Sequence, residues 1–113
     1  MKREYVLKKK YMFNYCYKVG KVVHGKSIVL YFTPSKNKNV KVGISVSKKV
    51  GKAVQRNRAK RVIREAITPF LTTIKQDYNI IIVARETFLS FSFSDISRDL
   101  YILLKRAELV NVE

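Results

Sequence analysis

The chain has 113 residues, a hydrophobic content of 47% and a formal net charge of +16. This length and hydrophobic content exclude a disordered basic tail, and we expect residues 1–113 to form a single domain. No apolar run reaches the roughly 18 residues of a transmembrane helix, and no apolar segment follows residues 1–5, so we expect no membrane partner. The single cysteine, Cys16, excludes an internal disulfide and favours a cytoplasmic location.

The first half of the chain predicts one helix and two strands. In a helix over residues 8–19, Met12, Cys16 and Val19 share one face, and Gly20 follows as a stop. Residues 27–33 are rich in β-branched and aromatic side chains and predict a strand. Residues 40–47 alternate and predict a second strand. One of its faces is small and polar, so that another group can lie close against it; this face carries Lys41, Gly43, Ser45 and Ser47.

The second half predicts a helix, a strand and a last helix. Apolar residues recur at helical spacing from Ala59 to Phe70, and Pro69 is expected to bend or end this helix. Residues 78–84 are apolar enough for a strand that is covered on both faces. The last helix is expected to have Ser94 as its N-cap. The predicted order is α-β-β-α-β-α, which is typical of an α+β domain with one sheet and helices packed on it.

Positive charge is concentrated in the first half of the chain. Residues 5–64 contain seventeen Lys or Arg and no Asp or Glu. A field this dense repels itself unless a polyanion offsets it, and a phosphate backbone is the natural candidate. The cationic residues at positions 56–64 could simply form a helix face exposed to water. However, most of them are Arg, whose guanidinium group suits bidentate contacts with phosphate. We therefore favour nucleic-acid binding.

Other motifs carry weaker signals. Residues 20–27 match the P-loop pattern, but a helix is predicted before them and a strand after them, the reverse of what phosphate binding requires. His24 is the only histidine and Cys16 the only cysteine, so one chain cannot form a Cys/His metal cluster. A catalytic Cys–His dyad is formally possible, but a cysteine on an apolar helix face is more often a small core residue. Asp95 and Asp99 lie one helical turn apart on the last predicted helix. We expect them to interact with the helix dipole and with water and not to bind a metal.

The sequence allows two roles for three aromatic residues, packing in the core or stacking on unpaired bases. Phe13 and Tyr17 are spaced by four residues and would pack together on a sheet, and Tyr31 lies in a predicted strand. They can also form a stacking platform for unpaired bases. Spacing alone favours the core, because most aromatic side chains are buried.

Residues 43–65 closely resemble the bacterial ribonuclease P protein component. The signature of that family is an Arg-Asn-Arg motif, here residues 56–58, that opens a helix after a Ser-Lys-Lys-x-Gly-x-Ala-Val run, here residues 47–54. The resemblance extends back through Phe13, Tyr17, Gly20 and residues 29–31, and forward through residues 78–85. It covers nearly the whole chain.

The resemblance implies a subunit of the ribonucleoprotein that removes the 5′ leader from precursor tRNA. In that family the RNA subunit is the catalyst and holds Mg²⁺, the protein alone binds no metal and has no catalytic residue, and no protein partner is required. The fold is expected to include a left-handed βαβ crossover, against the usual handedness.

The resemblance also assigns residues to two surfaces. The surface for the catalytic RNA comprises Lys48, Lys49, Lys52, Arg56, Asn57, Arg58, Lys60, Arg61 and Arg64. The cleft for the 5′ leader comprises Phe13, Tyr17 and Tyr31, with Gly43 and Ser45 on the polar strand face. A ribosomal protein or general RNA chaperone, and a stand-alone nuclease, are the two alternative functions.

Overall fold

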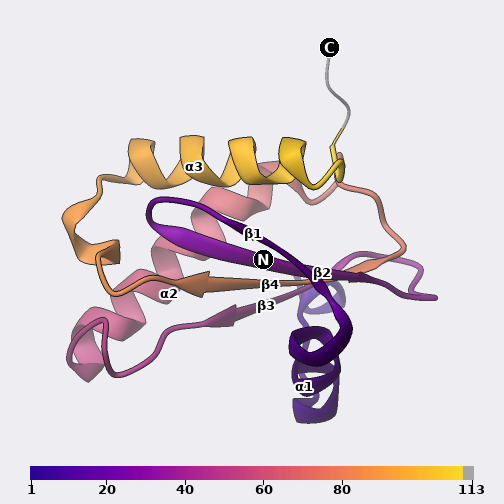
Figure 1. Ribbon diagram of the computed structural model, residues 1–113, viewed down its shortest axis with the longest axis horizontal. Helices are drawn as coiled ribbons and strands as arrows, with labels where there is room; N and C mark the ends of the chain where they lie inside the picture. The colour runs from indigo at the N-terminus through magenta and orange to yellow at the C-terminus, as the bar shows by residue number, and fades with distance from the viewer. Residues whose placement is uncertain (111–113) are drawn as a thin grey trace.

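The computed structural model describes residues 1–110, and its order of helices and strands is α-β-β-β-α-β-α (Figure 1). The helices are α1 (Lys10–Val19), α2 (Ala53–Ile67) and α3 (Phe93–Arg106). The strands are β1 (Lys21–His24), β2 (Ile28–Pro34), β3 (Lys41–Ser45) and β4 (Tyr78–Ala84). Short 3₁₀ helices cover Arg3–Tyr5, Thr68–Phe70 and Phe88–Ser90.

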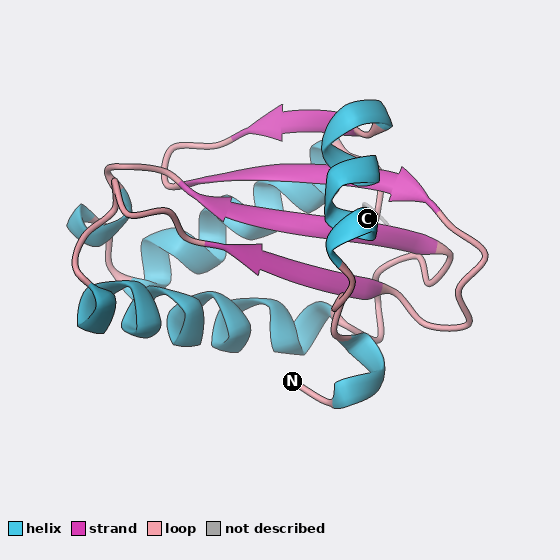
Figure 2. Ribbon diagram, turned by 90° about the horizontal axis from the view of Figure 1, so that it is seen from below, coloured by secondary structure: helices cyan, strands magenta, loops and turns pink. Residues whose placement is uncertain are grey.

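The four strands form one sheet in the order β1-β2-β4-β3, with β3 and β4 parallel and the other pairs antiparallel. Helix α1 lies on one face of the sheet, and α2 and α3 lie on the other (Figures 1 and 2). Figure 2 views the sheet from the α1 side, with α2 behind it and with β3 and β4 pointing the same way. Seen instead from the α2 side with β3 pointing up, β4 lies to the left of β3, so the β3-α2-β4 crossover is left-handed. This confirms the α+β fold and the handedness that the resemblance implied.

The main core lies between the sheet and helices α2 and α3. It buries the inward residues of β2 and β4, which alternate along each strand, and the apolar stripes of both helices: Ile28, Leu30, Phe32, Ile80, Ile82, Ala59, Ile63, Ala66, Ile67, Ile96, Leu100, Leu103 and Leu104. The predicted stripe of α2 is therefore confirmed. Strand β4 lies between β2 and β3 and is covered on both faces, which explains its nearly continuous apolar sequence.

A smaller core lies beneath α1. It consists of Leu7, Cys16 and Ile81, all buried. Burial raises the pKa of the Cys16 thiol to about 11, so the thiol is uncharged at neutral pH. His24 is exposed at the end of β1. Cys16 therefore has the environment of a small core residue and not that of an activated nucleophile.

Two local predictions were wrong. Strand β1 was not predicted, because it has only four residues, mostly exposed, and it exists through its antiparallel pairing with β2. The N-cap of α3 is Ser92 and not Ser94. The Ser92 hydroxyl accepts a hydrogen bond from the Asp95 N–H at 3.2 Å, and the Asp95 carboxylate accepts one from the Ser92 N–H at 3.2 Å. These contacts lower the pKa of Asp95.

The remaining boundaries agree with the sequence to within about two residues, except that α2 begins at Ala53, before both the Arg-Asn-Arg motif and the apolar stripe that starts at Ala59. Helix α1 begins at Lys10 without a side-chain cap and ends before Gly20. Helix α2 ends at Ile67, and Pro69 lies in the 3₁₀ turn that follows. Strand β4 has the predicted bounds, while β3 is shorter than predicted at both ends.

Candidate nucleic-acid interface

The strand register places the polar and aromatic residues of the α1 side in rows across the sheet. Tyr31 of β2 lies opposite Ile81 of β4, which lies opposite Gly43 of β3. Val29, Val83 and Ser45 form the next row. Successive rows are two residues apart along each strand, a distance of about 6.8 Å. Helix α1 packs over the first row and leaves the second partly exposed.

Two aromatic side chains of α1 make close contacts with the first row. The Phe13 ring lies directly on Gly43, where a Cβ atom would come within 2.6 Å of the ring. Tyr17 packs edge to face on Tyr31, with ring centroids 4.9 Å apart and ring planes at 87°. Phe13 and Tyr31 are half-buried, and Tyr17 is 38% exposed. We use the name aromatic cleft for the surface formed by these three residues and Ser45. Its side chains are partly core and partly free to stack.

A cavity of about 970 Å³ lies beside the aromatic cleft, because its lining includes Val29 and Val83 from the second row. His24, Lys26 and Arg85 also line this cavity. None of these was predicted as a site residue. The period of two in strands 27–33 and 78–84 would have placed Val29 and Val83 on the same face as Tyr31.

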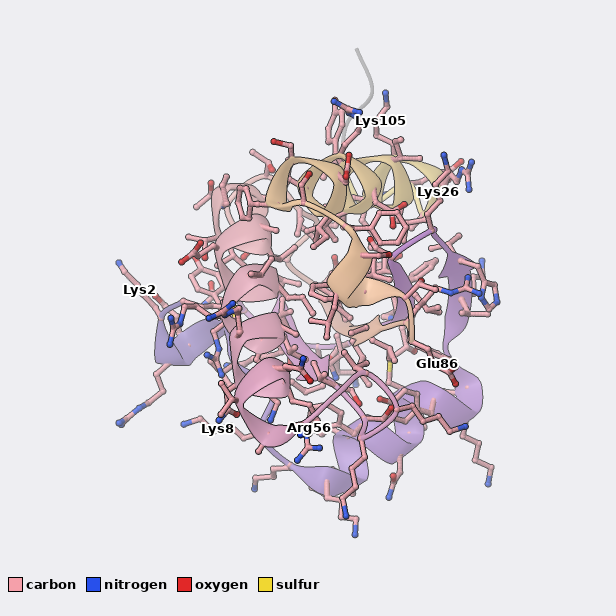
Figure 3. All side chains as sticks on the ribbon, turned by 90° about the vertical axis from the view of Figure 1, so that its left-hand side faces the viewer. Lys2, Lys8, Lys26, Arg56, Glu86 and Lys105 are labelled. Carbon is pink, nitrogen blue, oxygen red and sulfur yellow. The ribbon has the colours of Figure 1, made fainter. Side chains whose placement is uncertain are left out.

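The predicted cationic residues lie in the loop that leads from β3 into α2 and along α2 itself, as far as Arg64 in its last turn. Figure 3 labels Arg56 near the start of α2. Most of the side chains are exposed, namely Lys48, Lys49, Lys52, Asn57, Arg58, Arg61 and Arg64, whereas Arg56 and Lys60 are half-buried. The Arg56 Nη1 donates to the Gly51 carbonyl at 3.1 Å, so this guanidinium also holds the loop before α2.

The start of α2 is ordered without an acidic residue. The Lys52 N–H donates to the Gln55 Oε1 at 2.8 Å, and no Asp or Glu lies in the first turn. Within residues 1–110 the only ion pair joins Lys49 and Glu86, at 3.9 Å and exposed to solvent. Its contribution to stability is small. The positive end of the helix dipole and the surrounding cations therefore remain available to an external anion.

The P-loop pattern does not have the context that nucleotide binding requires. The turn Gly25-Lys26-Ser27 is followed by strand β2 and not by a helix. Its donors are already used by Asp99 of α3, which accepts from the Ser27 N–H at 2.9 Å, the Ser27 hydroxyl at 2.8 Å and the Lys26 N–H at 3.3 Å. The turn thus connects the β1–β2 hairpin to α3. Sequence reasoning did not find this role of Asp99.

Residues 1–110 contain no group of three or more His, Cys, Asp or Glu placed to hold a metal ion. None of the helices in this range is long and apolar enough to cross a membrane.

An α+β fold with a left-handed βαβ crossover, partly exposed aromatic side chains on one face of its sheet and a cationic helix on the other has the features of a small RNA-binding protein. The family model described as Ribonuclease P matches residues 1–108. The chain is 41% identical over 104 residues to the ribonuclease P protein component of Clostridioides difficile, covering 91% of each, and 38% identical over 109 residues to that of Macrococcus caseolyticus, covering 96% of this chain and 94% of the relative. The chain therefore belongs to the family of bacterial ribonuclease P protein components.

Solved structures agree with this assignment. The ribonuclease P protein of Staphylococcus aureus superposes with a TM-score of 0.85 at 36% identity, over 95% of this chain and 98% of that one. The protein of Thermotoga maritima superposes with a TM-score of 0.80 at 30% identity, over 89% and 96%. The alternative of a ribosomal protein or general RNA chaperone is not favoured.

Proposed function

We propose that this subunit binds the 5′ leader of precursor tRNA in the aromatic cleft and the catalytic RNA through α2, while the RNA cuts the substrate. The observation that carries the proposal is the placement of two unlike surfaces next to each other. The cavity beside the aromatic cleft is lined both by Val29 and Val83 of the sheet and by Lys49 of the cationic loop before α2. One molecule can therefore hold an unpaired strand and a folded RNA together.

The aromatic cleft suits a single strand without a fixed sequence. Tyr17 offers an exposed ring, and Phe13 and Tyr31 offer part of theirs. Every base has a face that stacks on such rings, so stacking tolerates any sequence. Gly43 is buried beneath Phe13, and we assign it the role of placing that ring, whereas Ser45 is half-buried beside the cleft and can face the leader.

The cationic surface suits the phosphates of the catalytic RNA. Arg58, Arg61 and Arg64 are exposed along α2. The guanidinium group binds phosphate oxygens in pairs, and each contact releases counterions from the RNA. Asn57 and Lys60 lie on the same helix, and Lys48, Lys49 and Lys52 extend the surface into the preceding loop.

Magnesium is assigned to the RNA subunit in this proposal. The cations of the protein lower the repulsion between the phosphates of the catalytic RNA and those of the substrate. A lower repulsion favours assembly and leaves the coordination of Mg²⁺ and the activation of water to the RNA.

Reconstitution with the catalytic RNA tests the proposal against its alternatives. We expect no cleavage by the protein alone, and tighter binding of substrates that carry a leader once the RNA is added. Cleavage by the protein alone would identify a stand-alone nuclease. Equal stimulation of unrelated RNAs would identify a general chaperone.

Tyr17→Ala is expected to weaken binding of leader-bearing substrates by about five- to a hundredfold, since stacking on one aromatic ring contributes roughly 1–3 kcal/mol. Binding of tRNA without a leader should not change. Tyr15→Ala is the matched control, because Tyr15 lies on the same helix, is 58% exposed and lines none of the cavities described above. An equal loss for both substrates would show that Tyr17 acts only in packing.

A further inference from the structure

A second cavity lies between the β1–β2 turn and α3. Its volume is about 490 Å³, and we call it the hairpin pocket. Its lining includes Lys26 from the turn and Arg98 and Arg106 from α3. It shares His24, Gly25, Lys26, Arg85 and Phe91 with the cavity beside the aromatic cleft. The two hollows are therefore joined around the hairpin end of the sheet, where Figure 3 labels Lys26.

The hairpin pocket has an excess of positive charge. Four cationic side chains line it, all exposed: Lys26, Arg85, Arg98 and Arg106. Its two carboxylates are engaged by backbone N–H groups of the chain itself. Asp99 accepts from Lys26 and Ser27, and Asp95 accepts from Ser92. In residues 1–110 no carboxylate lies within 4.0 Å of any of the four cationic groups. Their charge is available to an external anion.

The junction of the two hollows is ordered. The Arg85 Nη1 donates to the Gly25 carbonyl at 2.9 Å, which fixes this guanidinium beside the turn. Asp99 holds the same turn against α3, and a Cβ atom at Gly25 would lie 2.6 Å from the Asp99 carboxylate oxygens. The half-buried Phe91 ring forms part of the wall of both hollows and offers an aromatic surface beside the cations. Cations next to an aromatic ring are the features that bind single-stranded RNA.

We propose that the hairpin pocket is a second site for single-stranded RNA, which holds leader nucleotides farther from the tRNA than those in the aromatic cleft. Lys26 and Arg98 contact phosphates, and Phe91 contacts a base. This inference rests on the proposed function, because the strand must first occupy the cleft. The leader is the occupant rather than the catalytic RNA, since the pocket joins the cavity beside the aromatic cleft and no residue of α2 lines it.

Precursor tRNAs whose leaders are lengthened one nucleotide at a time test the inference, with the reconstituted holoenzyme. We expect the affinity of the unmodified protein to rise in two steps, the first for the aromatic cleft and the second for the hairpin pocket. Lys26→Ala/Arg98→Ala should remove the second step and keep the first. For the longest leader the loss should be about tenfold, and the slope of log K against log salt should flatten by about 1.4, since each cation contributes roughly 0.7 for a single strand.

Lys36→Ala/Lys75→Ala is the matched control, because both lysines are exposed and line neither hollow. It should keep both steps. If the second step persists in Lys26→Ala/Arg98→Ala, the hairpin pocket is not a leader site, while the proposed function of the aromatic cleft still stands. Weaker assembly with the catalytic RNA, or an equal loss for short and long leaders, also overturns the inference. Absence of the first step in the unmodified protein would instead refute leader binding in the aromatic cleft, and with it both proposals.

Discussion

Replacing Arg58, Arg61 and Arg64 together by alanine is expected to weaken binding to the catalytic RNA by roughly a hundredfold at low salt. All three side chains are exposed on α2. Each loses a phosphate contact, so the slope of log K against log salt should flatten by about 2 to 3. Alanine has the highest helix propensity, which keeps α2 intact. Filter binding to the catalytic RNA over a range of salt concentrations measures both quantities.

A matched triple variant distinguishes the loss of phosphate contacts on α2 from a general loss of three positive charges. Lys36, Lys38 and Lys75 are exposed cations in loops outside both proposed RNA surfaces. Replacing all three by alanine removes the same charge and should change the slope much less. Equal slopes for the two variants would show that the whole charge of the protein, and not the face of α2, binds the RNA. Thermal unfolding of both variants should stay close to that of the parent chain.

Gly43→Val is expected to lower the free energy of unfolding by about 2–3 kcal/mol and to abolish leader-dependent affinity. A Cβ atom at this position would clash with the Phe13 Cζ, so the ring and α1 must move away from the sheet. Overpacking a fitted contact typically costs about 1–3 kcal/mol. Because α1 also covers Leu7, Cys16 and Ile81, its displacement exposes the smaller core. Urea unfolding and substrate titration measure the two effects.

A double-mutant cycle with Phe13→Ala tests whether the clash with the Phe13 ring causes the loss of stability in Gly43→Val. In the Phe13→Ala background, Gly43→Val should cost little stability, because the ring that it strikes is gone. Ser45→Ala provides the control on the same strand face, one row away, and should be nearly neutral for stability. Additive costs for Gly43→Val and Phe13→Ala would contradict the close contact as the source of the effect.

The sequence determined the elements whose burial has a clear period. The apolar stripe from Ala59 to Ile67 identified α2 and its buried face, and the apolar run of β4 identified a strand covered on both sides. The exposure of the cationic residues on α2 could also be predicted from the sequence, because composition and helical spacing indicate which charged side chains face away from the core. The family resemblance added the prediction of a leader cleft, and it also added the left-handed crossover that the structure contains; spacing alone indicated neither.

The tertiary structure alone decided which distant residues meet. Strand β1 is too short and exposed for a local signal and depends on its pairing with β2. The contact of Phe13 with Gly43 depends on how α1 lies on the sheet, and the contact of Ser27 with Asp99 joins residues 72 positions apart. The same contact builds the hairpin pocket. Local periodicity reports which face of a segment is buried, but the register between strands and the packing of helices on them fix what lies against that face.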